Sequence, residues 1–204
     1  MIKNIIFDFD GVILDSVPVK TEAFRILFDH YDKHIVDTFI DYHLLNGGMS
    51  RYLKIRYFFE QLLGQDISEK NVMQLAEEYS ELTKRELAQD QYIIQDTFTF
   101  IKQNYQKYRM HIASGAAEDD LNFIYDTLDL NQYFFSIHGS PQSKDKLVKQ
   151  IIQSNQYIKG ETILIGDSIN DLEAANINNI VFYGYNNSNL DGYHYIDTFM
   201  DFDK

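Results

Sequence analysis

The chain of 204 residues contains no cysteine, which excludes disulfides, thiolate catalysis and cysteine-bound metals. Its six histidines are scattered along the chain. No apolar run approaches the roughly 20 residues that a membrane span requires. Met1 leads directly into a short apolar stretch followed by acids, so no signal peptide is expected. We therefore expect a protein of the reducing cytoplasm.

Basic residues are scarce as well, because 18 lysines and arginines stand against 31 acids and give a formal net charge of -13. They form no dense stripe, so we expect neither a nucleic acid nor a membrane as a partner. An acidic protein can still bind small phosphate esters where a metal and a few placed cations reverse the local field. The many tyrosines are compatible with a monomer or a homodimer.

Only two prolines occur, and no proline- or glycine-rich linker divides the chain. Its length suits one well-filled core domain with a small insertion. Strands that alternate with helices favour an α/β fold of three layers, a parallel sheet covered by helices on both faces. Amphipathic stretches predict the helices, and six short apolar runs predict strands at Asn4–Phe9, Arg109–Ala113, Phe135–His138, Thr162–Ile165, Asn179–Tyr183 and, more weakly, Tyr193–Ile196.

The alternation fails between Val17 and Tyr92, where three consecutive helical patterns occur. They lie around 23–31, over 52–63, and after a predicted N-cap at Ser68. About a dozen residues suffice for a normal crossover, so this block is too long to be one. We predict a core of residues 1–16 and 93–204, with residues 17–92 inserted as a helical cap over the carboxyl end of the first strand.

Two clusters of acids follow predicted strands, Asp8-Phe9-Asp10-Gly11 after the first and Gly166 to Asp171 after the fourth. Residues two apart share a face of a strand, and like charges held that close are costly unless a cation or shared proton uses them. The clusters therefore predict a divalent-metal site of Asp8, Asp10, Asp167 and Asp171. Asp8 is the candidate nucleophile, and Asp10 is the candidate acid and base. Asp171, three residues after Ser168, also fits a capping box.

Three further motifs predict contacts with a substrate. Ser114 and Gly115 close the second predicted strand before a helix, where a hydroxyl and backbone amides suit a phosphate oxygen. Lys144 falls in the first turn of a predicted helix, where a cation is unfavourable unless an anion faces it, and Lys146 is a rival for the same role. Asn46 to Arg51 is a glycine turn ending in a cation that can grip an anion. Two pairs look uninformative: Asp119-Asp120 suits a helix dipole, and Asp201 to Asp203 follows no strand.

Together these motifs resemble the haloacid dehalogenase-like superfamily of hydrolases across essentially the whole chain. The first motif matches Asp8–Val12, with the following Leu14-Asp15-Ser16 typical of the branch with a helical cap. The second matches Ser114, the third Lys144, and the fourth Gly166–Asp171. The lysine motif reads Gly-Ser-Pro-x-x-Lys instead of the more usual Lys-Pro, which leaves the choice between Lys144 and Lys146 open.

The resemblance implies a Rossmann-like core and Mg²⁺ bound by Asp8, the Asp10 carbonyl and Asp167. It also implies Asp8 as nucleophile, Asp10 as acid and base, and Ser114 and Lys144 as phosphate clamps. Its cap placement is that of phosphoglycolate phosphatase-like and β-phosphoglucomutase-like members, whose cap loop is similar to Gly48-Met49-Ser50-Arg51. The substrate is thus expected to meet Gly11, Gly115 and the cap residues Gly48, Ser50 and Arg51.

The leading hypothesis is a Mg²⁺-dependent phosphatase acting on a small phosphate monoester, such as a sugar phosphate, through an aspartyl-phosphate. Asp10 separates this activity from dehalogenation, which needs no acid for its leaving group. A phosphomutase would use the same residues and hold a second phosphate, with Arg51 as a candidate. A non-catalytic phospho-acceptor domain is the third alternative, although such receivers are about half as long and lack the helical insertion.

Overall fold

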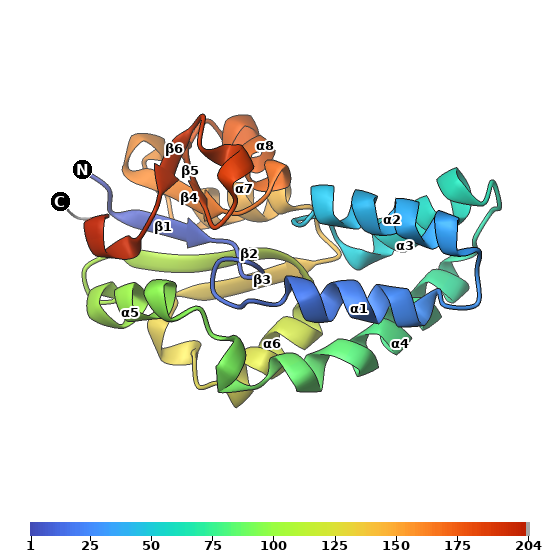
Figure 1. Ribbon diagram of the computed structural model, residues 1–204. Coiled ribbons are helices and arrows are strands. Elements are labelled where there is room, and N and C mark those ends of the chain that lie inside the picture. Colours follow the sequence, from blue (N-terminus) through green and yellow to red (C-terminus); the bar gives the residue numbers. More distant parts are fainter. Residues whose placement is uncertain (203–204) are drawn as a thin grey trace.

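Six parallel strands form a single sheet in the computed structural model, which describes residues 1–202 (Figure 1). The strand order is β3-β2-β1-β4-β5-β6, so the chain starts in the middle of the sheet and fills both sides. All six predicted strands are present, as β1 Asn4–Phe7, β2 Arg109–Ala117, β3 Ser136–Ser140, β4 Thr162–Gly166, β5 Val181–Tyr185 and β6 His194–Ile196.

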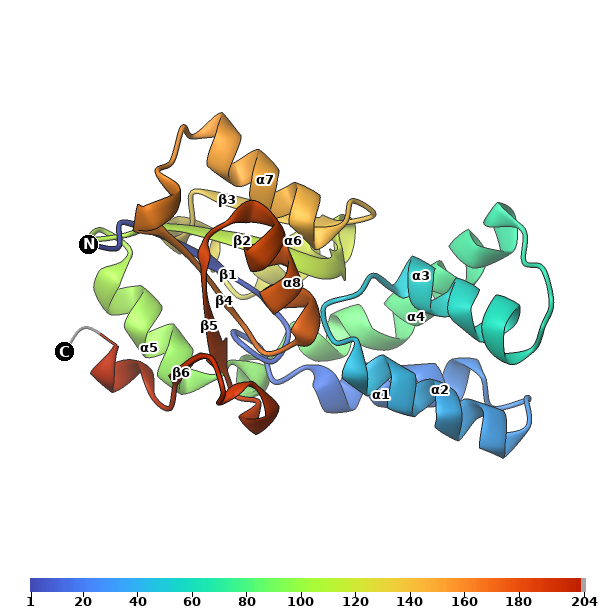
Figure 2. The same cartoon turned by 90° about the horizontal axis from the view of Figure 1, so that it is seen from above.

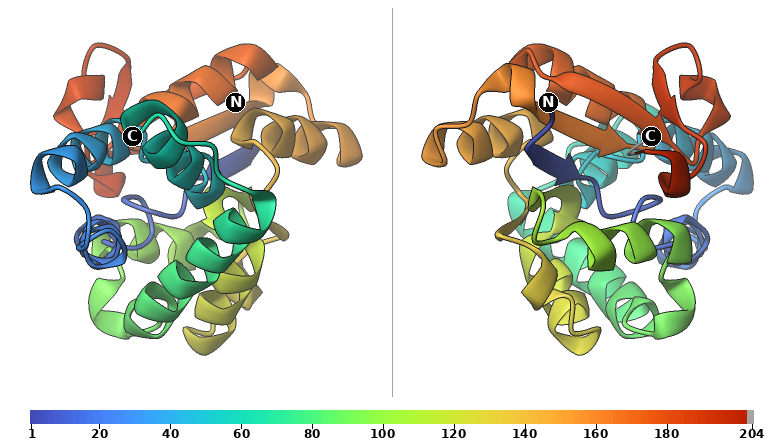
Figure 3. Two further views of the ribbon diagram at one scale, coloured as in Figure 1. Left: turned by 90° about the vertical axis from the view of Figure 1, so that its right-hand side faces the viewer. Right: turned by 90° about the vertical axis from the view of Figure 1, so that its left-hand side faces the viewer.

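Successive residues of β1 point to opposite faces and enter two different cores. Ile5 and Phe7 pack with α5 (Gln95–Asn104) and α6 (Glu118–Thr127), whereas Ile6 packs with α7 (Lys144–Ser154) and α8 (Ile169–Asn178). The end-on views of Figure 3 show the sheet between these two pairs of helices. The predicted fold class is confirmed: a three-layer, Rossmann-like α/β core.

Four α-helices lie between β1 and α5: α1 (Val17–Leu27), α2 (Lys33–Leu45), α3 (Arg51–Tyr57) and α4 (Glu69–Leu87). They lie beyond the carboxyl ends of the strands and are called the helical segment below (Figure 2). The segment has its own aromatic core, in which the rings of Phe28 and Phe58 stack with centroids 3.9 Å apart. None of the helices within residues 1–202 combines the length and apolarity needed to cross a membrane.

The sequence patterns predicted three of these helices and missed α2. Its composition hides it, because β-branched residues, histidines and aspartates are weak helix formers. Its buried positions Val36, Phe39, Ile40 and His43 nevertheless have helical spacing, and packing supplies the stability that propensity lacks. The predicted N-cap of α4 is confirmed, since the Ser68 hydroxyl accepts a bond of 3.2 Å from the amide of Asn71.

All six strands differ from their predicted bounds by at least one residue, and two of these differences have a clear structural cause. β2 continues past Ala113, and its register against β3 shifts before Ala117 pairs with Ser140. Ser114 therefore lies inside an irregular part of the strand and does not close it. β5 starts at Val181, because Asn179 ends α8 in the left-handed conformation with φ 56°.

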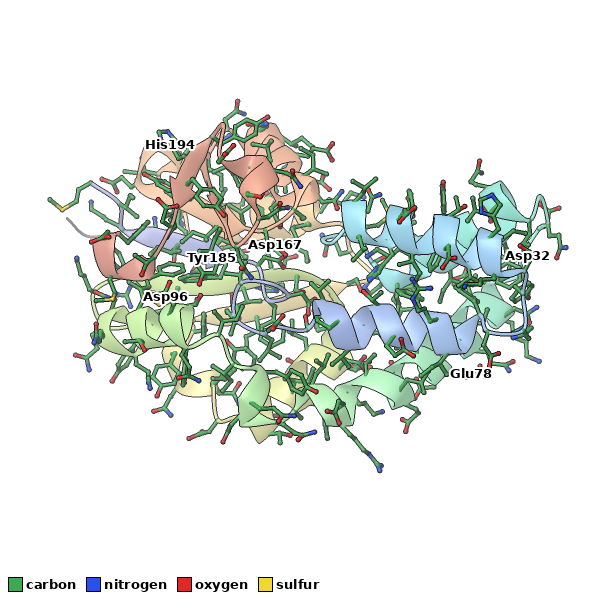
Figure 4. The ribbon with its side chains drawn as sticks, in the orientation of Figure 1. Asp32, Glu78, Asp96, Asp167, Tyr185 and His194 are labelled. Carbon is green, nitrogen blue, oxygen red and sulfur yellow. The ribbon has the colours of Figure 1, made fainter. Side chains whose placement is uncertain are left out.

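The last turn of the described chain is fastened to α5 by Asp96. Its carboxylate accepts hydrogen bonds from the Tyr185 hydroxyl (3.2 Å), the Thr198 hydroxyl (2.9 Å) and the Phe199 amide (3.0 Å). Figure 4 shows Asp96 and Tyr185 facing each other between α5 and the sheet. This bonding joins β5 and the turn after β6 to α5.

Candidate active site

The two acid clusters meet because β1 and β4 are neighbours in register. Phe7 lies opposite Ile165, so Asp8 and Asp167 follow the two strands at the same edge. The amide of Asp8 still donates to the carbonyl of Ile165 at 2.9 Å. One carboxylate oxygen from each of Asp8, Asp167 and Asp171 lies within 4.8 Å of the others. Asp167 lies at the junction of the sheet and the helical segment (Figure 4).

Lys144 reaches this carboxylate group from the first turn of α7. Its ammonium is buried, lies 2.8 Å from Oδ1 of Asp8, and pairs with Oδ1 of Asp171. Burial alone would lower the pKa of Lys144, but the charges of Asp171 and Asp8 outweigh it and raise the pKa. Lys146 is exposed on the outer side of the helix. Lys144 and Lys146 therefore lie on different sides of α7, and only Lys144 faces the carboxylates.

Asp171 serves the fold as well as the site. Its Oδ2 accepts hydrogen bonds from the Ser168 amide at 3.0 Å and from the Ser168 hydroxyl at 2.5 Å, which is the predicted cap of α8. Both of its oxygens are thus engaged, one by Ser168 and one by Lys144. A Cβ at Gly166 would overlap the Asp171 side chain, so this packing requires glycine there.

Three carboxylates share the one ammonium of Lys144, which leaves the group short of positive charge. Burial and the neighbouring Asp171 raise the pKa of Asp8 to about 7, and burial and Asp8 raise the pKa of Asp167 well above its ordinary value. The Asp167 carboxylate accepts no hydrogen bond from any residue in 1–202, although its main-chain carbonyl accepts one from Asn187 at 2.7 Å. A pocket of oxygen donors lacking a counter-charge suits a hard divalent cation such as Mg²⁺.

Asp10 lies apart from the three carboxylates and points toward α1. Its oxygens accept hydrogen bonds from the Ser16 hydroxyl at 2.6 Å and from the Lys20 ammonium at 2.5 Å. Burial would raise the pKa of Asp10, but the charge and hydrogen bond of Lys20 and the bond of Ser16 together lower it. Lys20 was missed in the sequence, where the only signal was its place one turn after Ser16 in a predicted helix.

The loop between α2 and α3 packs directly on the core. A Cβ at Gly48 would come within 2.8 Å of the Ser168 hydroxyl and 3.1 Å of the Lys144 ammonium, and a Cβ at Gly115 would overlap the Gly48 carbonyl. Gly11 has φ +74° and a Cβ there would overlap Asp167. Glycine is needed at these positions because Gly115 meets the Gly48 backbone, whereas Gly48 and Gly11 are approached by side chains. Ser114 is fully buried beneath them, and its hydroxyl accepts from the Ala116 amide at 3.0 Å.

Arg51 does not face the carboxylate group. Its guanidinium donates to Asp120, to the Ser80 hydroxyl and to the Ala76 carbonyl at 3.3 Å, and it stacks over the Tyr79 ring at 4.9 Å. The expectation that Asp119-Asp120 merely suits a helix dipole was wrong for Asp120, which is buried and paired across to α3. No sequence signal relates two residues so far apart in the chain.

The fold and this strand-end site are those of one large class of α/β hydrolases. The family model described as haloacid dehalogenase-like hydrolase matches residues 5–184. The chain therefore belongs to the haloacid dehalogenase-like hydrolases and is an enzyme. No curated protein sequence gives a significant match.

Solved structures with the same fold share little sequence with the chain. β-Phosphoglucomutase from Clostridium difficile is 19% identical with a TM-score of 0.77, and the match covers 97% of this chain and 92% of that one. CbbY from Rhodobacter sphaeroides, in complex with xylulose-1,5-bisphosphate, is 14% identical with a TM-score of 0.78 and coverages of 98% and 96%. The HAD-family protein YfnB from Bacillus subtilis, bound to magnesium, is 17% identical with a TM-score of 0.70 and coverages of 98% and 96%. At these identities the likeness concerns the fold.

Proposed function

We propose that the protein is a Mg²⁺-dependent phosphatase that hydrolyses a small phosphate monoester through an aspartyl-phosphate on Asp8. The observation that carries the proposal is the convergence of Asp8, Asp167 and Lys144 at one strand edge, with Asp10 two residues from the nucleophile. A lysine beside Asp8 can hold the phosphate as well as the carboxylate. Ser114 and the backbone amides in the irregular part of β2 would complete the anion-binding edge.

The chemistry needs two carboxylates in succession. Asp8 attacks phosphorus as the bond to the leaving oxygen breaks, and Asp10 gives its proton to that oxygen. Water then attacks the aspartyl-phosphate and gives a proton to Asp10, as the bond between phosphorus and Asp8 breaks. Asp8 and Asp10 are both restored, and the products are an alcohol and inorganic phosphate.

The residues present fit Mg²⁺. Asp8 and Asp167 would hold it together with the main-chain carbonyl of Asp10, because Lys144 alone does not balance the charge of the three carboxylates, and Asp171 would hold a bound water. When bound, the ion neutralises part of the phosphate charge so that an anionic nucleophile can approach. The same positive charge favours the ionised form of Asp8, which burial otherwise disfavours.

We also propose that residues 17–92 act as a cap. Gly48 approaches Lys144 and Gly115 closely and covers one side of the carboxylate group, while a cavity of about 320 Å³ lined by Asp10, Gly11 and Asp167 reaches it from another side. The contacts of Arg51 favour hydrolysis over phosphomutase activity. Its charge is satisfied by Asp120, which leaves it committed to holding α3 against α6 and not to a second phosphate.

Phosphate release from a panel of phosphorylated metabolites, with Mg²⁺ or EDTA, tests the proposal. We expect turnover that requires Mg²⁺ and is lost in Asp8→Asn, with Asp145→Asn as a matched control on α7. If no compound releases phosphate, or if Asp8→Asn still does so at the wild-type rate, the proposal is wrong. Phosphoryl transfer between positions of a sugar without release would instead establish the mutase.

A further inference from the structure

A second, small cavity lies between the core and the helical segment beside Asp10. It has a volume of about 30 Å³. Its lining includes Asp10, Lys20, His43, Lys54 and Tyr79, with Gly115 at the side of the carboxylate group. A leaving group attached to a phosphate near Asp8 and Asp10 would extend into this space.

The cations around the cavity are not equally compensated. Lys20 is paired with Asp10, and Arg51 with Asp120. Lys54 is 3% exposed and makes no ion pair with any carboxylate of residues 1–202, since its ammonium contacts only His43. A buried charge without a partner is costly, and burial together with the charge of Lys20 lowers the pKa of Lys54 to about 7. The fold therefore holds a cation in place without supplying its anion.

His43 of α2 fixes the position of Lys54 of α3. The Lys54 ammonium donates to Nδ1 of His43 at 2.9 Å and to its carbonyl at 3.4 Å. Because an ammonium only donates, Nδ1 accepts and Nε2 carries the hydrogen. That Nε2 is buried and has no hydrogen-bond partner. Burial and the charge of Lys54 lower the pKa of His43 to about 2, so the ring stays neutral. Lys54 has a third N–H to offer as well.

We propose that the substrate's leaving group carries a carboxylate, and that Lys54, positioned by His43, binds it and determines specificity. This inference rests on the proposed phosphatase function and assigns its substrate class: phosphate monoesters of short hydroxy acids. The small size of the cavity favours a carboxylate, because about 30 Å³ has room for roughly two water-sized groups. A second phosphate presents three oxygens around a larger centre and would need a wider space.

Matched ester pairs test the specificity. 2-Phosphoglycolate and 2-hydroxyethyl phosphate differ only in a carboxylate against a hydroxymethyl group, and the corresponding three-carbon pair allows for a longer reach. We expect the wild type to favour the carboxylate in kcat/KM by about tenfold or more, and Lys54→Met to lose that preference. Lys70→Met removes a charge from an exposed position of α4 and should keep the preference.

A binding measurement separates this inference from catalysis. 3-Phosphonopropionate and propylphosphonate cannot be hydrolysed, and they are titrated calorimetrically, with Mg²⁺, into the wild type, Lys54→Met and Lys70→Met. Tighter binding of the carboxylate compound that Lys54→Met alone removes would support the site even if no ester were hydrolysed. Equal binding of the two phosphonates, or no binding of either, overturns the inference. A short bisphosphate is added to the ester assay as a further substrate. If the wild type prefers it to the carboxylate ester and Lys54→Met loses that preference, the choice of carboxylate is wrong. Circular dichroism and the thermal midpoint show whether Lys54→Met is folded.

Discussion

The ammonium of Lys144 lies 2.8 Å from Oδ1 of Asp8, and both side chains are almost completely buried. The contact joins the first turn of α7 to the end of β1, although 136 positions separate the two residues in the printed sequence (144 minus 8). Because Lys144 also pairs with Asp171, one cation ties the candidate nucleophile to the cap of α8. Removing it would disturb the site and the fold together.

We expect Lys144→Met to abolish phosphatase activity and to lower the free energy of unfolding by about 3 kcal/mol at pH 7.5, because buried carboxylates lose their counter-charge. The loss should shrink toward pH 5.5, where the raised pKa of Asp8 lets protonation relieve the repulsion. Urea unfolding in EDTA at both pH values measures it. Lys146→Met, at an exposed position, should change stability by no more than about 0.5 kcal/mol. Equal effects of the two substitutions would contradict the assignment of Lys144.

Lys20 should control the pH profile through Asp10. Asp10 must carry a proton when the leaving group departs, yet Lys20 helps to lower its pKa, so only a small fraction is protonated at neutral pH. Without Lys20 that pKa rises, and we expect the alkaline limb of kcat/KM to move to higher pH in Lys20→Met. Steady-state kinetics from pH 3 to 9 on an alkyl phosphate, whose poor leaving group needs the proton, would show the shift. An unmoved limb would argue that another group supplies the proton.

The glycine contact between the loop and the core should govern closure. In Gly115→Ala the new methyl overlaps the Gly48 carbonyl, so the loop must move away from Lys144. We expect kcat/KM to fall by about tenfold or more and, because the backbone must shift, the free energy of unfolding to fall by about 1–3 kcal/mol. Gly160→Ala is the control, because a Cβ there meets nothing within 4 Å and φ is not positive. Wild-type kinetics in Gly115→Ala would show that this approach is not required for turnover.

The buried charge of Lys54 should lower the free energy of unfolding relative to a variant with an uncharged side chain at this position. Its pKa is about 7 in the folded state and near 10.5 when unfolded, so the folded state binds the proton less well. The resulting penalty is complete below about pH 7 and disappears as pH rises to 10.5. We expect Lys54→Met to be more stable than the wild type at pH 6.5, by an amount that decreases at pH 9.5. Chemical unfolding of both proteins at the two pH values, in EDTA, gives the difference. A variant that is less stable at pH 6.5 would contradict an uncompensated cation.

Many of the helices and strands were predictable because local sequence patterns specify them. Apolar runs of strand length, helical periodicity between them and the N-cap at Ser68 are properties of a few neighbouring residues. The two acid clusters were predictable for a further reason: parallel strands end at a common edge, so Asp8 and Asp167 had to lie near one another if β1 and β4 were adjacent. The helix α2 was not predicted, because its stability comes from packing and not from its composition.

What the sequence by itself determined is therefore the alternation of strands and helices, and the acids at the strand ends, since both follow from short-range periodicity. Only the tertiary structure decided which charges meet. Lys144 points into the site and Lys146 away from it. Arg51 pairs with Asp120, and Lys20 pairs with Asp10. Lys54 contacts His43 and no carboxylate of residues 1–202. Such pairs depend on helix phase and on crossings between distant segments, and no local pattern encodes them.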